Sequence, residues 1–205
     1  MAGAHQAETG PRRTGRRPGP TLTRDAILRA ARAAFAARGY DAVSVRAIAR
    51  DARVDPALVH RFFGSKESVF VAAMQLPVAP SRLVPGILAP GPDGLGERVV
   101  ETLIALYDDT RSSAPLQAFL RAAVSNEQAA TMLREFLTTE VLARVAVAAP
   151  DQPELRSALA ASQILGLVMA RSIVRIPQIA RADRAQLVAC VGPTIQRYLT
   201  GPLRV

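Results

Sequence analysis

The stretch DARVDPALVHRFFGSKESVF, residues 51–70, constrains the fold more than any other part of the chain. Asp55 is a favourable helix N-cap, and Pro56 fits the first position of a helix, where its missing N–H is not needed. Gly64 is a typical residue for ending a helix. Together these signals predict a short helical unit of nine residues, Asp55–Phe63, with both of its ends marked.

Another short helix is predicted directly before this one. Ser44 can cap a helix from Val45 to about Asp51, and residues 52–54 then form a joint between the two helices. Two short helices with such a joint are the geometry of a helix-turn-helix, whose second helix enters the major groove of DNA. The second unit would be roughly 13 Å long, which suits a groove about 12 Å wide.

The apolar pattern of the second helix separates a buried face from an outward face. Val59 and Phe63 share one side with Val54, and we expect them to pack on Ile48 and Phe35. The side chains left without a core to enter are Ala57, Leu58, His60 and Arg61. We expect the major groove to receive them.

Flanking residues complete a small domain. Thr23 is predicted to cap a first helix, Arg24–Arg38, and Gly39 to end it. A fourth helix is predicted over residues 65–75, with Ser65 at its start. Before this domain, the paired arginines and few apolar groups at 1–22 predict a flexible basic arm.

The balance of basic and acidic residues also changes at the end of this domain. Residues 1–75 carry 13 basic and 6 acidic side chains, whereas residues 76–205 carry 13 and 11. A basic front part favours a polyanionic partner, although an ordinary surface with an arginine bias is the alternative. We therefore predict three parts: the arm at 1–22, a helix-turn-helix domain at 23–75 and a second domain at 76–205.

The second domain is also predicted to be helical. Hydrophobic residues make up 49% of the chain, and no run alternates with the period of a strand, so we predict an all-α protein. Residues 76–96 are rich in proline and glycine, which indicates a loop with at most a short helical piece. The longer helices are predicted at Leu95–Thr110, Pro115–Ser125, Glu127–Ala148, Glu154–Arg175 and Arg184–Leu199. Pro193 lies inside the last one and predicts a kink there or an earlier break.

The block TLTRDAILRAARAAFAARGYDAVSVRAIARDARVDPALVHRFFGSKESVFVAAM resembles the DNA-binding domain of the TetR family of bacterial transcriptional regulators. Residues 161–203 also resemble the C-terminal region of actinobacterial members. The resemblance implies a three-helix DNA-binding domain, joined through a fourth helix to a helical domain that binds a small molecule and dimerises. Arg53, Leu58 and His60 stand where the family usually has glycine, threonine and tyrosine, so the base preference of relatives does not transfer.

The resemblance also implies a set of DNA-contacting residues. Ser44 and Lys66 would hold phosphates, while Arg46 and Arg61 could reach guanine O6 and N7. The full implied set is Ser44, Val45, Arg46, Asp55, Pro56, Ala57, Leu58, His60, Arg61 and Lys66.

Alternatives stay open at several of these positions. Ala57 and Leu58 could meet thymine methyls, and His60 could replace the usual tyrosine as a phosphate or base donor. Arg46 could instead be a solvated helix residue, and Arg53 lies outside the usual contact set. The basic arm could lie in an adjacent minor groove or remain an unbound tail.

For the second domain, the resemblance implies a homodimer formed through the last two helices. The segment 158–175 is apolar almost all round, more than one buried face requires, and Gly166 allows close approach of another helix. A buried helix of a monomer is the alternative. A twofold dimer suits half-sites about 34–36 Å apart, and so a pseudo-palindromic operator in double-stranded DNA.

The middle helices could enclose an apolar cavity for a small-molecule effector of unknown identity. Taken alone, each candidate is more often a core or surface residue. The candidates are Tyr107, Arg111, Arg121, Met132, Phe136 and Gln163.

An enzyme fits the sequence poorly. The two histidines, His5 and His60, are too far apart in the pattern to form a metal pair, and no GxSxG or GxxxxGK[ST] motif occurs. Cys190 is the only cysteine and has no predicted base partner. We therefore predict no catalytic residue, no metal and no cofactor.

The remaining expectations concern location and mode of action. No secretory signal or membrane span is evident, so we expect a cytoplasmic protein without membrane contact. A DNA-packaging protein would spread basic charge more widely than residues 76–205 do. We predict a dimeric, sequence-specific repressor released by its effector, with activation left open because it depends on where the operator lies.

Overall fold

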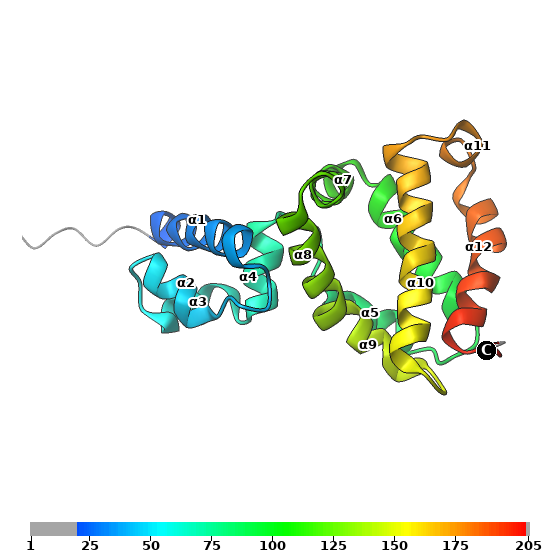
Figure 1. Cartoon of the computed structure of the whole chain (residues 1–205), viewed down its shortest axis with the longest axis horizontal. Coiled ribbons are helices and arrows are strands. Elements are labelled where there is room, and N and C mark those ends of the chain that lie inside the picture. The colour runs from blue at the N-terminus through cyan, green and yellow to red at the C-terminus, as the bar shows by residue number, and fades with distance from the viewer. Residues whose placement is uncertain (1–19, 204–205) are drawn as a thin grey trace, which may run out of the picture.

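The computed structural model describes residues 20–203, apart from the side chains of residues 20 and 110–112. Every regular element in this part of the chain is helical, which confirms the predicted fold class. Figure 1 shows a smaller bundle of α1–α4 beside a larger bundle that holds the later helices. No described helix is long and apolar enough to span a lipid bilayer.

The smaller bundle follows the predicted order of short helices. Its elements are α1 (Pro20–Arg38), α2 (Val45–Asp51), α3 (Pro56–Phe63) and α4 (Lys66–Ala73). The predicted start of α1 was wrong, because Thr23 lies inside the helix instead of capping it. Proline is tolerated in a first helical turn and threonine costs little inside a helix, so nothing prevents the earlier start. Residues 1–19 of the predicted arm lie outside the described residues.

The larger bundle begins after a turn in which Gln75 takes a positive φ of 57°, so α4 ends two residues earlier than predicted. Its elements are α5 (Pro80–Leu88), α6 (Leu95–Asp108), α7 (Thr110–Ser125), α8 (Glu127–Phe136), α9 (Ala143–Val145), α10 (Pro153–Val168), α11 (Pro177–Ala180) and α12 (Arg184–Leu199). The helix α5 is the short piece expected in the proline-rich segment.

Two details of this bundle were not predicted. The run from α8 to residue 148 contains a π-helical segment, Leu137–Leu142, and α10 continues into another, Met169–Ile173. A short 3-10 turn, Ala146–Ala148, closes the first of these runs. The small helix α11 was also missed.

Prolines marked helix boundaries less reliably than expected. The predicted start of α7 at Pro115 was wrong, because the helix begins at Thr110 and runs through that proline. No break occurs at Pro193 either, since α12 covers 184–199 without interruption. A proline inside a helix removes one hydrogen bond but does not end the helix when its two halves are held by packing.

Close packing of α12 on α6 fixes the far side of the larger bundle. A Cβ atom on Gly96 would lie 2.2 Å from the carbonyl oxygen of Gly192, so the two backbones meet where both residues are glycine. Arg156, only 2% exposed, ties the start of α10 to the end of α12 by donating to the carbonyl oxygens of Tyr198 and Gly201 at 3.0 and 2.8 Å. These contacts hold α6, α10 and α12 as one layer.

Candidate nucleic-acid interface and effector cavity

The helix-turn-helix is set by its caps and by the joint. The Ser44 hydroxyl accepts a hydrogen bond from the amide of Ala47 at 3.1 Å, and the Asp55 carboxylate accepts one from Ala57 at 2.7 Å. In the joint, Arg53 has a φ of 57°. The amide of Val54 donates to the carbonyl of Ala49 at 2.9 Å, which completes the helix-ending motif that usually contains glycine. Arg53 adopts this backbone at a cost of roughly 1–2 kcal/mol.

The outward face of α3 is close to the one predicted. Val59 is fully buried, whereas Ala57, His60 and Arg61 are exposed. Leu58 is half-buried, so it presents less surface than we expected. His60 is also partly engaged, because its Nδ1 lies 3.2 Å from the carbonyl oxygen of Gly64.

Two arginines are available for a DNA partner. Arg46 at the start of α2 and Arg61 on α3 are exposed, and neither makes a hydrogen bond or ion pair within the described part of the chain. Ser44, Asp55 and Pro56 are also exposed, and Val45 is half-buried. A guanidinium that is free in the unbound protein keeps its full set of donors for a base edge or a phosphate.

Lys66 is placed differently from these arginines. It is half-buried, with Nζ 4.3 Å from the centre of the Tyr40 ring and 3.2 Å from the carbonyl oxygen of Asp41, to which it donates. Burial lowers the pKa of the Lys66 ammonium. Its first role in this structure is to hold the turn between α1 and α2.

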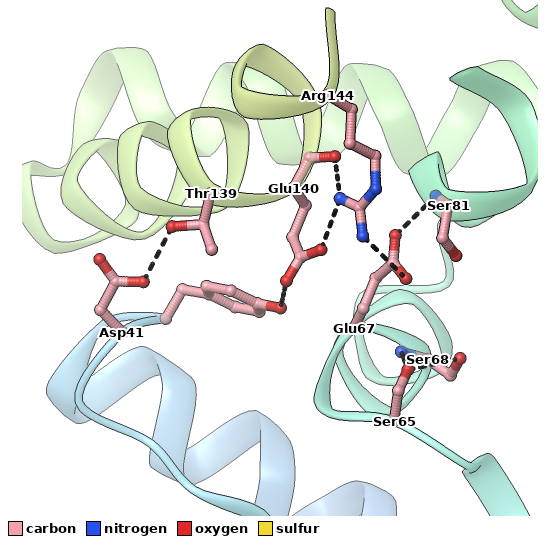
Figure 2. A network of polar contacts seen from close by, with 9 residues as sticks. Asp41, Ser65, Glu67, Ser68, Ser81, Thr139, Glu140 and Arg144 are labelled. Atoms are coloured by element: carbon pink, nitrogen blue, oxygen red, sulfur yellow. Dashed lines mark hydrogen bonds and ion pairs between the residues drawn. The ribbon is translucent and has the colours of Figure 1, made fainter. Parts of the chain in front are cut away.

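The two bundles meet through a buried polar network, shown in Figure 2. The Tyr40 hydroxyl donates to the carboxylate of Glu140 at 2.5 Å. Arg144 donates to the same carboxylate at 2.7 Å and lies 3.9 Å from the carboxylate of Glu67, which also accepts a hydrogen bond from the amide of Ser81 at 2.8 Å. Tyr40 of the α1–α2 turn is therefore joined to Glu140 of the π-helical segment, and Glu67 of α4, which holds the start of α5, is joined to Arg144 of α9.

Burial shapes the chemistry of this network. Glu67 is only 5% exposed, and the ring of Tyr40 is fully buried. Burial, and then the hydrogen bond to Glu140, raises the pKa of Tyr40, so the hydroxyl stays protonated and remains a donor at physiological pH. The Tyr40 hydroxyl is thus a fixed hydrogen-bond donor to Glu140.

A second group of contacts holds the α1–α2 turn from the same side. The Glu135 carboxylate accepts hydrogen bonds from the amides of Tyr40 and Asp41 at 2.7 and 3.1 Å, and the Thr139 hydroxyl donates to Asp41 at 3.2 Å. Gly39 has a φ of 79°, and a Cβ atom there would lie 2.5 Å from the Glu135 carboxylate. The positive φ therefore favours glycine, and a Cβ atom there would also displace the Glu135 carboxylate.

The opposite side of the same helical run faces a cavity of about 230 Å³ in the larger bundle. Residues 133–145 contribute to its wall through Leu133, Phe136, Leu137, Val141, Leu142 and Val145. None of the described lining residues is charged, and only Tyr107 and Ser157 carry a polar side-chain group. The Ser157 hydroxyl donates within its own helix, to the carbonyl oxygen of Pro153 at 2.8 Å.

Tyr107 is the remaining polar group in the wall. Its hydroxyl has no hydrogen-bond partner in the described part of the chain, and burial raises its pKa to about 12. It therefore stays neutral and free to donate or accept one hydrogen bond, on a residue that lines an otherwise almost entirely apolar cavity.

The predicted pocket residues are only partly brought together. Tyr107 and Phe136 line the cavity as expected. Met132 was placed wrongly, because it is buried in the core of the smaller bundle. Arg121 and Gln163 are exposed and are not among the lining residues, since they sit on outward faces of α7 and α10. The side chain of Arg111 lies outside the described residues.

The sequence reasoning missed the residues that connect the two bundles, which are Tyr40, Glu67, Glu135, Glu140 and Arg144. Glu135 and Glu140 are five residues apart, which would place them about 140° apart on an α-helix. That spacing does not suggest that both contact the same turn. Only the π-helical segment between them brings both to the same turn.

Comparison with known proteins agrees with this two-part architecture. The sequence profile described as "Bacterial regulatory proteins, tetR family" matches residues 27–73. The profile described as "Tetracyclin repressor-like, C-terminal domain" matches residues 93–199, more than half of the chain. No curated protein matches the sequence.

Several solved structures are similar to the chain. A TetR-family regulator from Streptomyces coelicolor is 37% identical over 90% of this chain and 98% of its own, with a TM-score of 0.49. A TetR-family transcriptional regulator from Mesorhizobium loti is 19% identical over 89% of this chain and 97% of its own, with a TM-score of 0.47. NalD, the secondary repressor of the MexAB-OprM multidrug efflux pump in Pseudomonas aeruginosa, is 22% identical over 87% of this chain and 97% of its own, with a TM-score of 0.46.

Both profiles lead to the same assignment. The chain belongs to the TetR family of bacterial regulatory proteins and is a DNA-binding transcriptional regulator rather than an enzyme.

Proposed function

We propose that this protein is a dimeric repressor that leaves its operator when a small-molecule effector occupies the cavity of the larger bundle. The observation that carries the proposal is the two-sided helical run at residues 133–145. One side lines the cavity, and the other holds the α1–α2 turn and α4 through Glu135, Glu140 and Arg144. A ligand that displaces this run must also displace the DNA-binding bundle.

In this proposal α3 enters the major groove. Arg61 on α3 and Arg46 on α2 donate hydrogen bonds to base edges or neighbouring phosphates, because both are exposed and unpaired among the described residues. Ser44, Val45, Asp55, Pro56, Ala57, Leu58 and His60 make up the surrounding contact surface. Lys66 contributes its charge to the phosphate backbone from its half-buried position.

The dimer forms through α10 and α12, the two long helices at the C-terminal end. Apolar or small side chains on their exposed faces support this interface, including Leu155 and Gly166 on α10 and Ala189 on α12. A twofold dimer presents two copies of α3 to successive major grooves, so the operator is pseudo-palindromic double-stranded DNA. Because its target is DNA, we place its action in the bacterial cytoplasm.

Release follows from preferential binding of the effector to one arrangement. An effector that binds better when the helical run is displaced favours a different separation of the two α3 helices, and the dimer no longer fits both half-sites. Repression is supported by the tetracycline-repressor-like profile of the C-terminal region. An operator upstream of the promoter, with transcription rising on binding, would indicate activation instead.

Selection of bound duplexes from a random pool tests the DNA-binding part. We expect one enriched sequence with two related half-sites whose centres are about 10–10.5 base pairs, or a multiple of that, apart. Enrichment of single half-sites, with a monomer in solution, would contradict the dimer. No enrichment over the starting pool would contradict sequence-specific binding.

Arg61→Ala tests the role of α3, with Arg82→Ala as a matched control, because Arg82 is an exposed arginine of α5. We expect Arg61→Ala to weaken operator binding by about 1–3 kcal/mol and to relax preference at one base position of each half-site. Arg82→Ala is expected to leave both unchanged. A uniform loss on all sequences after Arg61→Ala would show that this side chain contacts only phosphates.

A further inference from the structure

The cavity has a chemical character that restricts its ligand. Its wall combines aliphatic and aromatic side chains from α6, α7, α8, the π-helical segment and α10. The charged residues of the neighbouring network face the smaller bundle, where Glu67, Glu140 and Arg144 pair with one another. No described side chain is left to neutralise a charge placed inside the cavity.

Size adds a second restriction. The volume of about 230 Å³ is smaller than the roughly 300–1,000 Å³ of pockets that hold drug-sized ligands. It corresponds to roughly eight water molecules at their liquid volume, and therefore to a compound of about eight non-hydrogen atoms unless the wall moves.

Tyr107 places a third restriction on the ligand. Among the described residues its hydroxyl is the one lining group that is polar and unpartnered, and its raised pKa keeps it neutral. A ligand with one hydroxyl, carbonyl or ether oxygen can satisfy it, and a ligand with several polar groups would bury the others without partners.

We propose that the effector is a small, uncharged and mainly apolar molecule with a single polar group that hydrogen-bonds to the Tyr107 hydroxyl. This inference rests on the proposed effector control of DNA binding and names the chemical class of the effector. Carboxylates, ammonium compounds and polyhydroxylated compounds of the same size are excluded by the cost of burying their polar groups.

Three probes of equal chain length test the charge restriction: octan-1-ol, octanoate and octylammonium, titrated calorimetrically into the full-length protein at pH 7. We expect octan-1-ol to bind at least about 100-fold more tightly than either ion. Octanoate or octylammonium binding as tightly as the alcohol would overturn the proposal, and so would an absence of binding by all three.

Two variants test the place and the polar contact. Ala160→Leu fills space in the wall and is expected to weaken binding of octan-1-ol at least tenfold. Tyr107→Phe is expected to weaken octan-1-ol about 3- to 10-fold while leaving propylbenzene, which has no polar group, unchanged. Tyr198→Phe is the matched control, because Tyr198 is not among the lining residues. Equal affinity of octan-1-ol for Tyr107→Phe and the original protein would contradict the hydrogen bond.

Measuring operator affinity in the same samples separates this inference from the proposed function. If an ion binds in the cavity and releases the operator, the effector class is wrong but effector control stands. If octan-1-ol binds at Tyr107 and operator affinity stays unchanged, the chemistry of the cavity stands and effector control by this probe is contradicted.

Discussion

The cores of the two bundles differ in kind. In the smaller bundle Phe35, Tyr40 and Phe70 are fully buried, and the Tyr40 and Phe70 rings meet edge to face with centroids 5.0 Å apart. In the larger bundle the core is mainly aliphatic and surrounds a cavity of about 230 Å³. A filled aromatic core keeps the DNA-binding surface in one shape, whereas a core with empty space can rearrange around a ligand.

The boundary between the bundles is not a boundary between their cores. Met132 and Phe136 of α8 are buried in the aromatic cluster of the smaller bundle, and Phe136 also lines the cavity. The Phe136 ring stacks on Phe70 with a centroid distance of 4.4 Å. The filled core and the hollow core therefore share side chains, with Phe119 and Leu76 beside Phe136, and this couples their packing directly.

The largest expected effect comes from equal truncations in the two cores. Ile27→Ala removes a fully buried side chain of α1, and Ile164→Ala removes a side chain of α10 that lines the cavity and is 9% exposed. We expect a loss of about 4 kcal/mol in the free energy of unfolding for Ile27→Ala and about 2 kcal/mol for Ile164→Ala. The second is smaller because part of that side chain already faces empty space.

Unfolding in urea, monitored by circular dichroism, measures both values. A loss for Ile164→Ala as large as that for Ile27→Ala would mean that the larger bundle is packed as tightly as the smaller one in solution.

The two bundles also differ in how well their helix limits could be predicted from the sequence. The limits of α2 and α3 were predicted because local groups determine them: Ser44, Asp55 and Gly64 act on their own neighbours. Arg53, which stands where the family usually has glycine, takes a positive φ for the same reason. In the larger bundle, α7 runs through Pro115 and α12 through Pro193, because tertiary packing overrides the local preference.

The same difference holds for the candidate sites: the exposed DNA-binding residues were predicted better than the pocket residues. Exposed residues of the helix-turn-helix were predicted from helical periodicity, and most of them are exposed. The sequence does not show how the separate helices are rotated relative to one another. Arg121 and Gln163 were therefore predicted to line a cavity that they do not line. The contacts of Glu135 and Glu140 depend on a π-helical segment that no sequence pattern indicated.

A smaller effect is expected where the turn of one bundle meets the helix of the other. Gly39→Ala places a Cβ in a left-handed backbone and within 2.5 Å of the Glu135 carboxylate. We expect a loss of about 2–3 kcal/mol in the free energy of unfolding in the original protein, and about 1–2 kcal/mol in a Glu135→Ala background, where only backbone strain remains. The difference measures the contact between the bundles. Equal losses in both backgrounds would show that the carboxylate moves aside without cost.

The smallest change in stability, and the most specific change in function, is expected for Tyr40→Phe. The substitution keeps the buried ring and removes only the hydroxyl that donates to Glu140 at 2.5 Å, while Arg144 still pairs with that carboxylate at 2.7 Å. We expect a loss of about 1 kcal/mol in the free energy of unfolding. Operator affinity without effector should change little, because Tyr40 is buried and the substitution keeps its ring.

The effect of the effector on operator affinity should fall several-fold in Tyr40→Phe, since one of the bonds that join the cavity wall to the DNA-binding bundle is gone. Fluorescence anisotropy of labelled operator, with and without a cavity-binding alcohol, measures this ratio in Tyr40→Phe and in the control Tyr198→Phe. An unchanged ratio in Tyr40→Phe would mean that the coupling passes through the shared packing of Phe136 and Phe70 rather than through the polar network. A lowered ratio in both variants would point to a general loosening of the protein, because Tyr198 has no part in the contact between the bundles.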